Sequence, residues 1–362
     1  MATQFQDETI YDGQDNVQGE GLRPTAPEIF WNRRQFLRGL GVGSLGARVL
    51  GVGALGISGG SFWGCSGSGP MYPEPPLLAG PFEDSGRKIP NTVARREMTA
   101  RDVAAVHTNF YEFSPGKAGD LRGLVERWDT VPEAVEIDGA CDRPGRFSVD
   151  DLKTFPLEQR LYHFRCVERW AMNVPWVGFP LWRLLEQAAP RPEARWFIFE
   201  SAADPDAMPG LKKAPHYPWP YREALRRDEA EHDLAFLALG AYDRVLPKQH
   251  GAPLRLVLPW KYGYKGAKSI VRITCVEETP STFWHEVSPH EYGLLSNVNP
   301  NIPHPRWSQE LSFWLRDDPT WPTGVDTFPT ALFNGYEDEV AHLYPDEPRT
   351  PQRLLKPGDI AR

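Results

Sequence analysis

The chain of 362 residues has little cysteine and more acidic than basic side chains. Its four cysteines, Cys65, Cys141, Cys166 and Cys275, stand far apart and form no CxxC pair. This spacing excludes a zinc knuckle and a thioredoxin-like motif, and so few cysteines exclude a disulfide scaffold. A single Cys141–Cys275 pair remains open for an oxidising compartment. The net charge of -8 argues against nucleic acid as a partner, because phosphate neutralisation needs a basic face.

The N-terminal part is predicted to be an export signal. Residues 1–30 are polar, acidic and poor in aliphatic side chains, which is typical of disorder. The twin arginines Arg33 and Arg34, followed by a Phe-Leu pair, precede a Gly/Ala/Leu/Val-rich stretch to about Ser61. This pattern resembles a twin-arginine signal, so we expect export to the periplasm. A membrane helix is the alternative, but the charge of Arg48 would cost it about 2.5–3.5 kcal/mol on insertion scales.

After the export signal, the chain is predicted to contain a linker, one folded domain and a tail. The segment around Cys65 has a faint likeness to a lipoprotein cleavage site, although the bulky side chains before the cysteine fit such a site poorly. The following residues are rich in glycine, proline and serine, which favours a linker. We therefore expect four regions: a disordered N-terminus with the signal at 1–64, a linker at 65–103, the folded domain at 104–345 and a tail at 346–362.

Short strands dominate the predicted elements. The 36 prolines favour short elements and fixed turns over long helices. One short helix is expected after Ser148, which caps it together with Asp151, and another after Pro180. The strands do not alternate with helices in a βαβ rhythm, so the fold class is mixed α+β. Strands are expected at Val135–Ile137, Leu161–Cys166, Trp196–Glu200, Leu234–Leu239, Leu254–Leu258 and Ser269–Val276.

Cys166 is the first candidate for chemistry. It ends an alternating strand, and the neighbouring Arg165 and Arg169 favour the thiolate, which is the form that binds metals or attacks substrates. A buried, inert thiol is the common alternative. A Cys–His nucleophile is disfavoured because His163 lies on the opposite face of the strand.

A glycine- and lysine-rich segment is the second candidate. It comprises residues 250–255 and 260–269. Glycines let the backbone approach a ligand closely, and successive free N–H groups form an anion nest. The lysines and Arg255 add charge suited to one phosphate. The spacing is that of neither a Walker loop nor a dinucleotide fingerprint. The alternative is a solvated basic hairpin.

The third candidate is the run from Thr108 to Phe113. Polar hydrogen-bonding groups alternate here with aromatic rings, which suits a flat, polar heterocycle. The alternative is a strand or turn in which Phe110 and Phe113 only pack.

Together, these segments resemble the family of catalytic subunits of periplasmic protein-methionine-sulfoxide reductases. That family has the sulfite-oxidase-like molybdopterin-binding fold of mixed short strands and short helices. The resemblance spans about 106–345. It is carried by Asn109–Phe113, Arg165–Glu168 with Trp170, Val174–Pro180, Pro259–Ser269, Glu291–Gly293, Asn297–Pro300, His304–Gln309 and Leu332–Tyr336.

The resemblance implies a cofactor and its ligands. Cys166 would be the sole protein ligand of molybdenum in a Mo-molybdopterin cofactor with one pyranopterin. Thr108, Ser201 and His250 stand where the best-known members carry Asn, Thr and Asn. Each replacement still donates a hydrogen bond, and His250 is expected to make one cofactor contact titratable near neutral pH. The pterin and its phosphate would be bound by Thr108, Tyr111, Glu112, Ser201, His250, Arg255, Gly266, Ala267 and Lys268.

The resemblance also implies the reaction. Reduced molybdenum would take oxygen from methionine sulfoxide in oxidised exported proteins, with electrons from a membrane haem-containing partner subunit. Oxidation of sulfite, or reduction of a small sulfoxide or N-oxide, is the alternative among enzymes. A non-enzymatic alternative is a protein that only binds an anion at the glycine- and lysine-rich segment.

Overall fold

The computed structural model places most of the predicted domain. The expected disordered N-terminus, the twin arginines and Cys65 lie outside the described residues. Within the described ranges, no helix is both long and apolar enough to cross a membrane. The structure describes residues 74–80, 82–87, 89–90, 92–93, 97–115, 120–129, 131–315 and 326–352.

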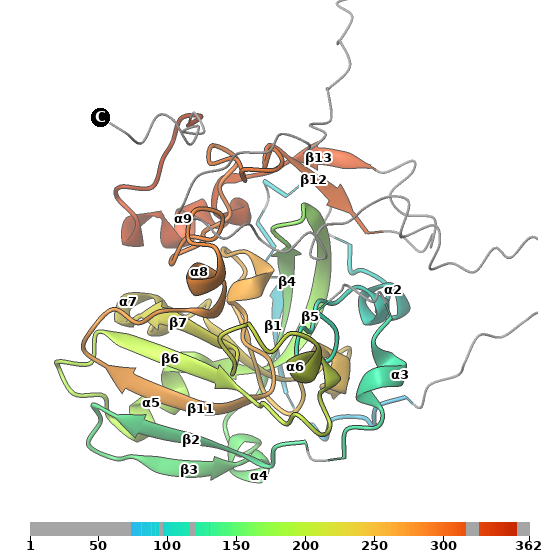
Figure 1. Ribbon diagram of the computed structural model, residues 1–362, viewed down its shortest axis with the longest axis vertical. Helices are drawn as coiled ribbons and strands as arrows, with labels where there is room; N and C mark the ends of the chain where they lie inside the picture. The colour runs from blue at the N-terminus through green and yellow to red at the C-terminus, as the bar shows by residue number, and fades with distance from the viewer. Residues whose placement is uncertain are drawn as a thin grey trace, which may run out of the picture. The chain divides into compact units, whose positions relative to one another are not determined.

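The larger of two sheets is built around a long antiparallel hairpin (Figure 1). Its order is β1-β4-β5-β12-β13, and β8 pairs with β5 and also carries β9 and β10. The strands are β1 (Glu83–Arg87), β4 (Glu158–Arg165), β5 (Trp170–Pro180), β8 (Phe236–Ala241), β9 (Arg244–Val245), β10 (Arg255–Val257), β12 (Leu311–Trp314) and β13 (Thr327–Pro329).

The smaller sheet has the order β3-β2-β11-β6-β7 (Figure 1). Only β2 and β11 run parallel in it. Its buried side chains join those of the larger sheet in one hydrophobic cluster. The strands are β2 (Ala134–Gly139), β3 (Gly145–Ser148), β6 (Trp196–Ser201), β7 (Arg222–Arg226) and β11 (Ile270–Val276).

Helices are short throughout the described part, and the longest has 8 residues. The mixture of strands and short helices confirms the α+β class. The helices are α2 (Arg101–Val106), α3 (Arg122–Val125), α4 (Val149–Leu152), α5 (Leu181–Ala188), α6 (Pro209–Lys213), α7 (Arg227–Ala230), α8 (Phe283–Val287) and α9 (Glu337–Val340), with 3₁₀ turns η2 (Lys248–His250), η3 (Gly263–Lys265), η4 (Leu332–Gly335) and η5 (Ala341–Leu343).

The predicted elements are confirmed with boundary shifts of one to three residues. Each expected strand overlaps one of β2, β4, β6, β8, β10 and β11. Ser148 and Asp151 cap α4 reciprocally: the Ser148 hydroxyl accepts from the Asp151 N–H, and the Asp151 carboxylate accepts from the Ser148 N–H. Pro180 precedes α5, whose buried face includes Leu181, Leu184 and Leu185.

Strand β5 was not predicted, although it is the centre of the larger sheet. All eleven of its residues are buried, so it has no alternation of apolar and polar side chains. It also contains Pro175, which cannot donate a ladder hydrogen bond. The structure places Pro175 between the β12 contact at Trp170 and Ala171 and the β8 contact that begins at Trp176. Pro175 therefore lies where neither β12 nor β8 needs a backbone N–H from β5, so the missing donor breaks no ladder hydrogen bond.

Residues 74–103 contain both surface and packed segments. Strand β1 pairs in parallel with β4, with Glu83 opposite Glu158. Leu78, Ile89 and Val93 are buried. This stretch of the expected linker therefore packs against the domain.

The Cys141–Cys275 pair lies in the core as two free, buried thiols. Parallel pairing of β2 with β11 places Cys275 opposite Gly139, and the chain then brings Cys141 into hydrogen-bonding contact with Cys275. Burial raises the pKa of Cys275 to about 12, and Cys141 adds to the rise. A thiol with this pKa stays protonated at neutral pH.

Candidate functional site

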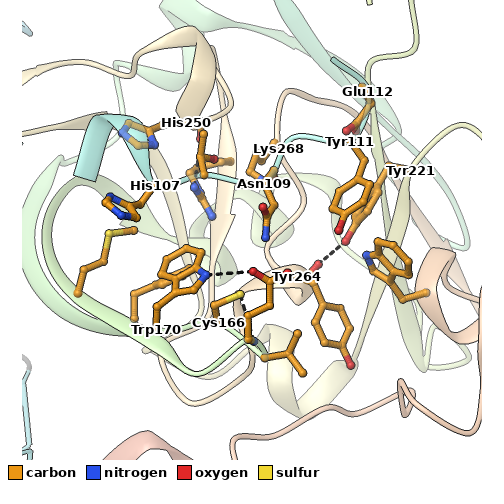
Figure 2. A pocket seen from close by; sticks show the side chains of 18 of the residues that line it. His107, Asn109, Tyr111, Glu112, Cys166, Trp170, Tyr221, His250, Tyr264 and Lys268 are labelled. Carbon is orange, nitrogen blue, oxygen red and sulfur yellow. Dashed lines mark hydrogen bonds between the residues drawn. The ribbon is translucent and has the colours of Figure 1, made fainter. Parts of the chain in front are cut away.

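A cavity beside the β4–β5 hairpin gathers most of the residues singled out from the sequence (Figure 2). It encloses about 770 Å³, including the part open to solvent. Ser201, Gly266 and Ala267 do not line it. The candidates that do are Thr108, Tyr111, Glu112, Cys166, His250, Arg255 and Lys268.

Cys166 is the first residue of the tight turn between β4 and β5. Its N–H donates to the Trp170 carbonyl at 2.9 Å, and its own carbonyl accepts from the Arg169 N–H at 2.9 Å. Arg169 has a φ of 79°, an uncommon conformation for a residue other than glycine. The Arg169 guanidinium lies 4.4 Å from the centre of the Phe313 ring. The turn is thereby fixed against β12.

Two carbonyls of this turn are held on the side away from the thiol. The Cys166 carbonyl also accepts from Arg165 Nη1. The Val167 carbonyl accepts from Trp307 Nε1 at 3.0 Å and from Gln309 Nε2 at 2.8 Å. The Glu168 N–H donates to Cys166 Sγ at 3.5 Å. We name these contacts the carbonyl clamp. They orient the backbone so that an N–H dipole faces the sulfur.

Arg165 is the central member of the carbonyl clamp. It is fully buried, and burial lowers the pKa of its guanidinium to about 10. Its Nε donates to Ser312 Oγ at 2.7 Å and its Nη2 to Gln309 Oε1 at 2.9 Å. A buried charge is costly unless it is hydrogen-bonded. Arg165 therefore supports the turn from behind.

His163 takes no part in the cavity. Its Nδ1 lies 2.8 Å from Asn173 Oδ1, and its ring stacks on Trp314. Burial lowers the pKa of His163 to about 4. The neutral ring on the opposite face of β4 excludes the Cys–His nucleophile, as the strand alternation predicted.

The opposite end of the cavity is cationic. Arg255 and Lys268 are buried, and neither forms an ion pair with a carboxylate among the described residues. Lys268 Nζ donates to the Asn109 carbonyl at 2.7 Å, and Arg255 Nη1 donates to the His250 carbonyl at 3.1 Å. Burial lowers the pKa of Arg255 to about 10, so the guanidinium stays charged at neutral pH.

The carboxyl group of Glu112 interacts electrostatically with Lys268. Burial raises the pKa of Glu112 well above its ordinary range, and the charge of Lys268 opposes that rise. Burial lowers the pKa of Lys268, and the charge of Arg255 lowers it further. The cavity end therefore holds more positive than negative charge at neutral pH, an environment that suits an anion.

The expectation that His250 titrates near neutral pH is wrong for this structure. Burial lowers the pKa of His250 to about 3, and the charges of Arg255 and Lys268 lower it further. The imidazole is therefore neutral across the physiological range. Burial, the main cause of this shift, depends on the fold and is not visible in the sequence.

The glycines of the basic segment make room for its two cations. Gly251 has a φ of +100°, and a Cβ there would lie 2.7 Å from Lys268 Cβ. A Cβ on Gly266 would lie 2.6 Å from the Leu256 carbonyl oxygen and 3.1 Å from Arg255 Nη2. Gly266 and the fully buried Ala267 thus position Arg255 without lining the cavity.

The other lysines of this segment point elsewhere. Lys261 Nζ lies 2.7 Å from Glu229 Oε1, and Lys265 Nζ lies 2.6 Å from Glu223 Oε2, with all four side chains buried. Neither lysine lines the cavity. The segment is therefore no solvated hairpin, and Arg255 and Lys268 alone carry its charge into the cavity.

Ser201 lies next to the cationic end. It pairs with Ile270 across β6 and β11, just after Lys268. Its hydroxyl is buried and has no hydrogen-bond partner among the described residues. Buried polar atoms are usually hydrogen-bonded, so this one has capacity for a ligand or water.

Aromatic side chains line much of the remaining cavity. In Figure 2, His107 and Trp170 lie on one side of Cys166, and Tyr111 and Tyr221 lie on the other. The Trp170 indole donates to Glu168 Oε2 at 3.2 Å. Several of these residues have no signal in the sequence, because they come from loops without periodicity. The lining residues that the sequence analysis did not select as ligands include His107, Phe164, Met172, Tyr221, Tyr264, Trp284 and Tyr292.

Residues 125–284 match the family model of the oxidoreductase molybdopterin binding domain. This match confirms the expected molybdopterin-binding fold. In the described ranges, no group of three or more His, Cys, Asp or Glu side chains could hold a metal ion.

Known proteins resemble the chain over most of its length. The protein-methionine-sulfoxide reductase catalytic subunit MsrP of Xanthomonas campestris is 43% identical over 78% of this chain and 85% of its own length. The proteins of that name from Pseudomonas syringae and Campylobacter jejuni are 46% and 45% identical, over 70% and 68% of this chain and 74% and 81% of their own lengths. A structure of the sulfane dehydrogenase SoxCD from Paracoccus pantotrophus covers 50% of this chain and 46% of its own, with 21% identity and a TM-score of 0.37.

Proposed function

The chain belongs to the family of protein-methionine-sulfoxide reductase catalytic subunits, and we propose that it reduces methionine sulfoxide in exported proteins with one Mo-molybdopterin. It is an oxidoreductase with a molybdopterin-binding domain. The identity to relatives that bear this name supports the substrate. The placement of the Cys166 thiol and two unpaired cations in one cavity supports the cofactor.

The residues present fit such a cofactor. A thiolate is a ligand that suits a redox transition metal, and Cys166 presents its sulfur to the cavity. Arg255 and Lys268 offer charge-assisted hydrogen bonds to a phosphate. The Ser201 hydroxyl has no partner among the described residues, but it does not line the cavity. Cys166 would hold the metal, and Arg255 and Lys268 would hold the phosphate end.

The reaction requires two electrons and two protons. The sulfoxide loses its S–O bond and becomes a thioether, while its oxygen leaves as water. When bound, the molybdenum centre supplies the two-electron oxygen-transfer chemistry. The protein contributes the fixed thiol of Cys166, and its buried aromatic lining limits the access of water. Burial raises the pKa of Glu112 to about 7, so this lining carboxyl group can hold a proton at neutral pH.

A partner must supply the electrons. The relatives are named catalytic subunits, which implies that they act with another subunit. We propose that the electron donor of this chain is a membrane subunit that contains haem. The proposal rests on the family resemblance of the sequence.

The first experiment measures activity and metal together. The protein, isolated after export, should contain molybdenum and reduce methionine sulfoxide in a peptide with an artificial electron donor. Sulfite should not be oxidised at a comparable rate under the same conditions. Sulfite oxidation without sulfoxide reduction would overturn the proposed substrate. Folded protein that contains no molybdenum would favour a protein that only binds an anion.

Export by the twin-arginine route is also proposed, on the pattern around Arg33 and Arg34. Replacement of both residues by lysine should retain the protein and its cofactor in the cytoplasm. Cell fractionation with a molybdenum determination measures this. Normal amounts of the double variant in the periplasm would contradict the proposal.

Loss of Lys268 or Arg255 should weaken cofactor retention. Lys268→Ala removes a charge-assisted contact worth about 1.5–3 kcal/mol. That loss weakens retention roughly tenfold to a hundredfold. The purified variant should therefore contain substoichiometric molybdenum, while activity per bound metal stays nearly normal. Arg255→Ala should behave alike, and the double variant should lose more.

The matched control is Lys212→Ala. Lys212 is exposed and pairs only with Asp206 at the surface, and such pairs contribute little. Its molybdenum content should equal that of the unmodified protein. We call Arg255 and Lys268 the phosphate cradle. Full molybdenum occupancy in the variant that lacks both side chains would rule out this role for them.

A further inference from the structure

Three aromatic rings form a continuous surface in the cavity. Trp284 and Tyr292 have ring centroids 5.1 Å apart, and Tyr264 and Tyr292 have centroids 5.3 Å apart at an interplanar angle of 82°. All three rings line the same cavity as Cys166. We call Tyr264, Trp284 and Tyr292 the aromatic wall.

The aromatic wall is held from behind. The Tyr292 hydroxyl accepts from Arg306 Nη2 at 3.2 Å, and Arg306 pairs with the buried Glu291 at 2.5 Å. The Tyr292 carbonyl lies 2.9 Å from His285 Nδ1. The Tyr264 hydroxyl bonds to Ser296. Rings fixed in this way lose little further freedom when a ligand binds.

Two of the three rings of the aromatic wall come from other parts of the chain than the cations. Trp284 belongs to α8 and Tyr292 to the loop after it, whereas His250, Arg255 and Lys268 come from η2, β10 and the segment before β11. Tyr292 nevertheless lies within electrostatic reach of the sulfur: burial raises the pKa of Tyr292, and the Cys166 charge adds to the rise. A group on the aromatic wall therefore lies in the same cavity as the thiol.

We propose that the aromatic wall is the subsite for the methyl-sulfoxide end of a methionine sulfoxide side chain. The proposal rests on the proposed function and names the residues that recognise its substrate. The sulfur of that side chain carries a methyl and a methylene group, and sulfur contacts with aromatic rings are favourable. Such a contact changes an equilibrium constant about twofold to tenfold.

The depth of the site also selects the substrate. Only 6% of Cys166 is exposed, so a rigid protein surface does not reach its sulfur. A single unbranched side chain does, if its backbone segment lies at the cavity mouth. The subsite therefore favours methionine sulfoxide in flexible segments over residues buried in folded proteins.

The test compares substitutions that keep or remove a ring. Tyr292→Phe keeps the ring and removes the hydroxyl, and Tyr292→Leu removes the ring. Trp284→Phe and Trp284→Leu form a second pair. The measurements are kcat and KM of the holoenzyme for a methionine sulfoxide peptide, per bound molybdenum. Calorimetry gives Kd for the same peptide with methionine sulfone, which keeps the methyl and methylene groups.

Each leucine variant should raise KM and Kd about twofold to tenfold, and kcat should change less than twofold. Each phenylalanine variant should lose less than its leucine counterpart, because it keeps a ring. Unchanged KM and Kd in both leucine variants would overturn the subsite. Equal losses in leucine and phenylalanine variants would also overturn it, because the ring would then not matter. If the unmodified enzyme reduces no methionine sulfoxide, the proposed function itself is wrong, which is a distinct outcome.

Discussion

The orientation of the backbone between Cys166 and Glu168 is the constraint on which the site depends. The carbonyl clamp turns the carbonyls of Cys166 and Val167 toward Arg165, Trp307 and Gln309. The thiol and the Glu168 N–H are thereby left facing the cavity. Because Arg165 is buried, its N–H groups must find their hydrogen-bond acceptors within the protein. Loss of one acceptor leaves part of a buried charge without a partner, which lowers the stability of the fold. The segment 307–312, far away in sequence, thus fixes the direction of one sulfur atom.

The cavity separates two kinds of chemistry. One end carries the charges of Arg255 and Lys268 beside His250, which burial above all keeps neutral. The aromatic wall has uncharged rings, and its supporting charges, Arg306 and Glu291, lie behind it. The cavity therefore offers contacts both to an anionic group and to an apolar group.

Much of the fold and part of the site followed from the sequence. Alternation predicted β4 and placed His163 away from Cys166, and the capping pattern predicted α4. Strand β5 was missed because a fully buried strand shows no alternation of apolar and polar residues. It also contains Pro175, which is tolerated because it lies in a gap between the partner strands β12 and β8. Such a gap is a property of the sheet and not of the local sequence.

The sequence predicted the site residues that lie in glycine-rich, charged segments. It did not predict features that depend on tertiary contacts. Lys261 and Lys265 look like Lys268 in the sequence, but they pair with Glu229 and Glu223, which lie far away in the chain. The lowered pKa of His250 also depends on the tertiary structure, since burial of the imidazole is its main cause. Trp284 joins the cavity from α8, a helix of five residues that is too short to show a periodic pattern.

The central claim is that Cys166 binds molybdenum directly. X-ray absorption at the molybdenum edge, recorded on the purified protein and on Cys166→Ser, tests it. The phosphate cradle should retain the cofactor in the serine variant, so both samples should contain metal. The account predicts that the variant loses one sulfur neighbour from the first coordination shell. An identical sulfur shell in both samples would contradict it.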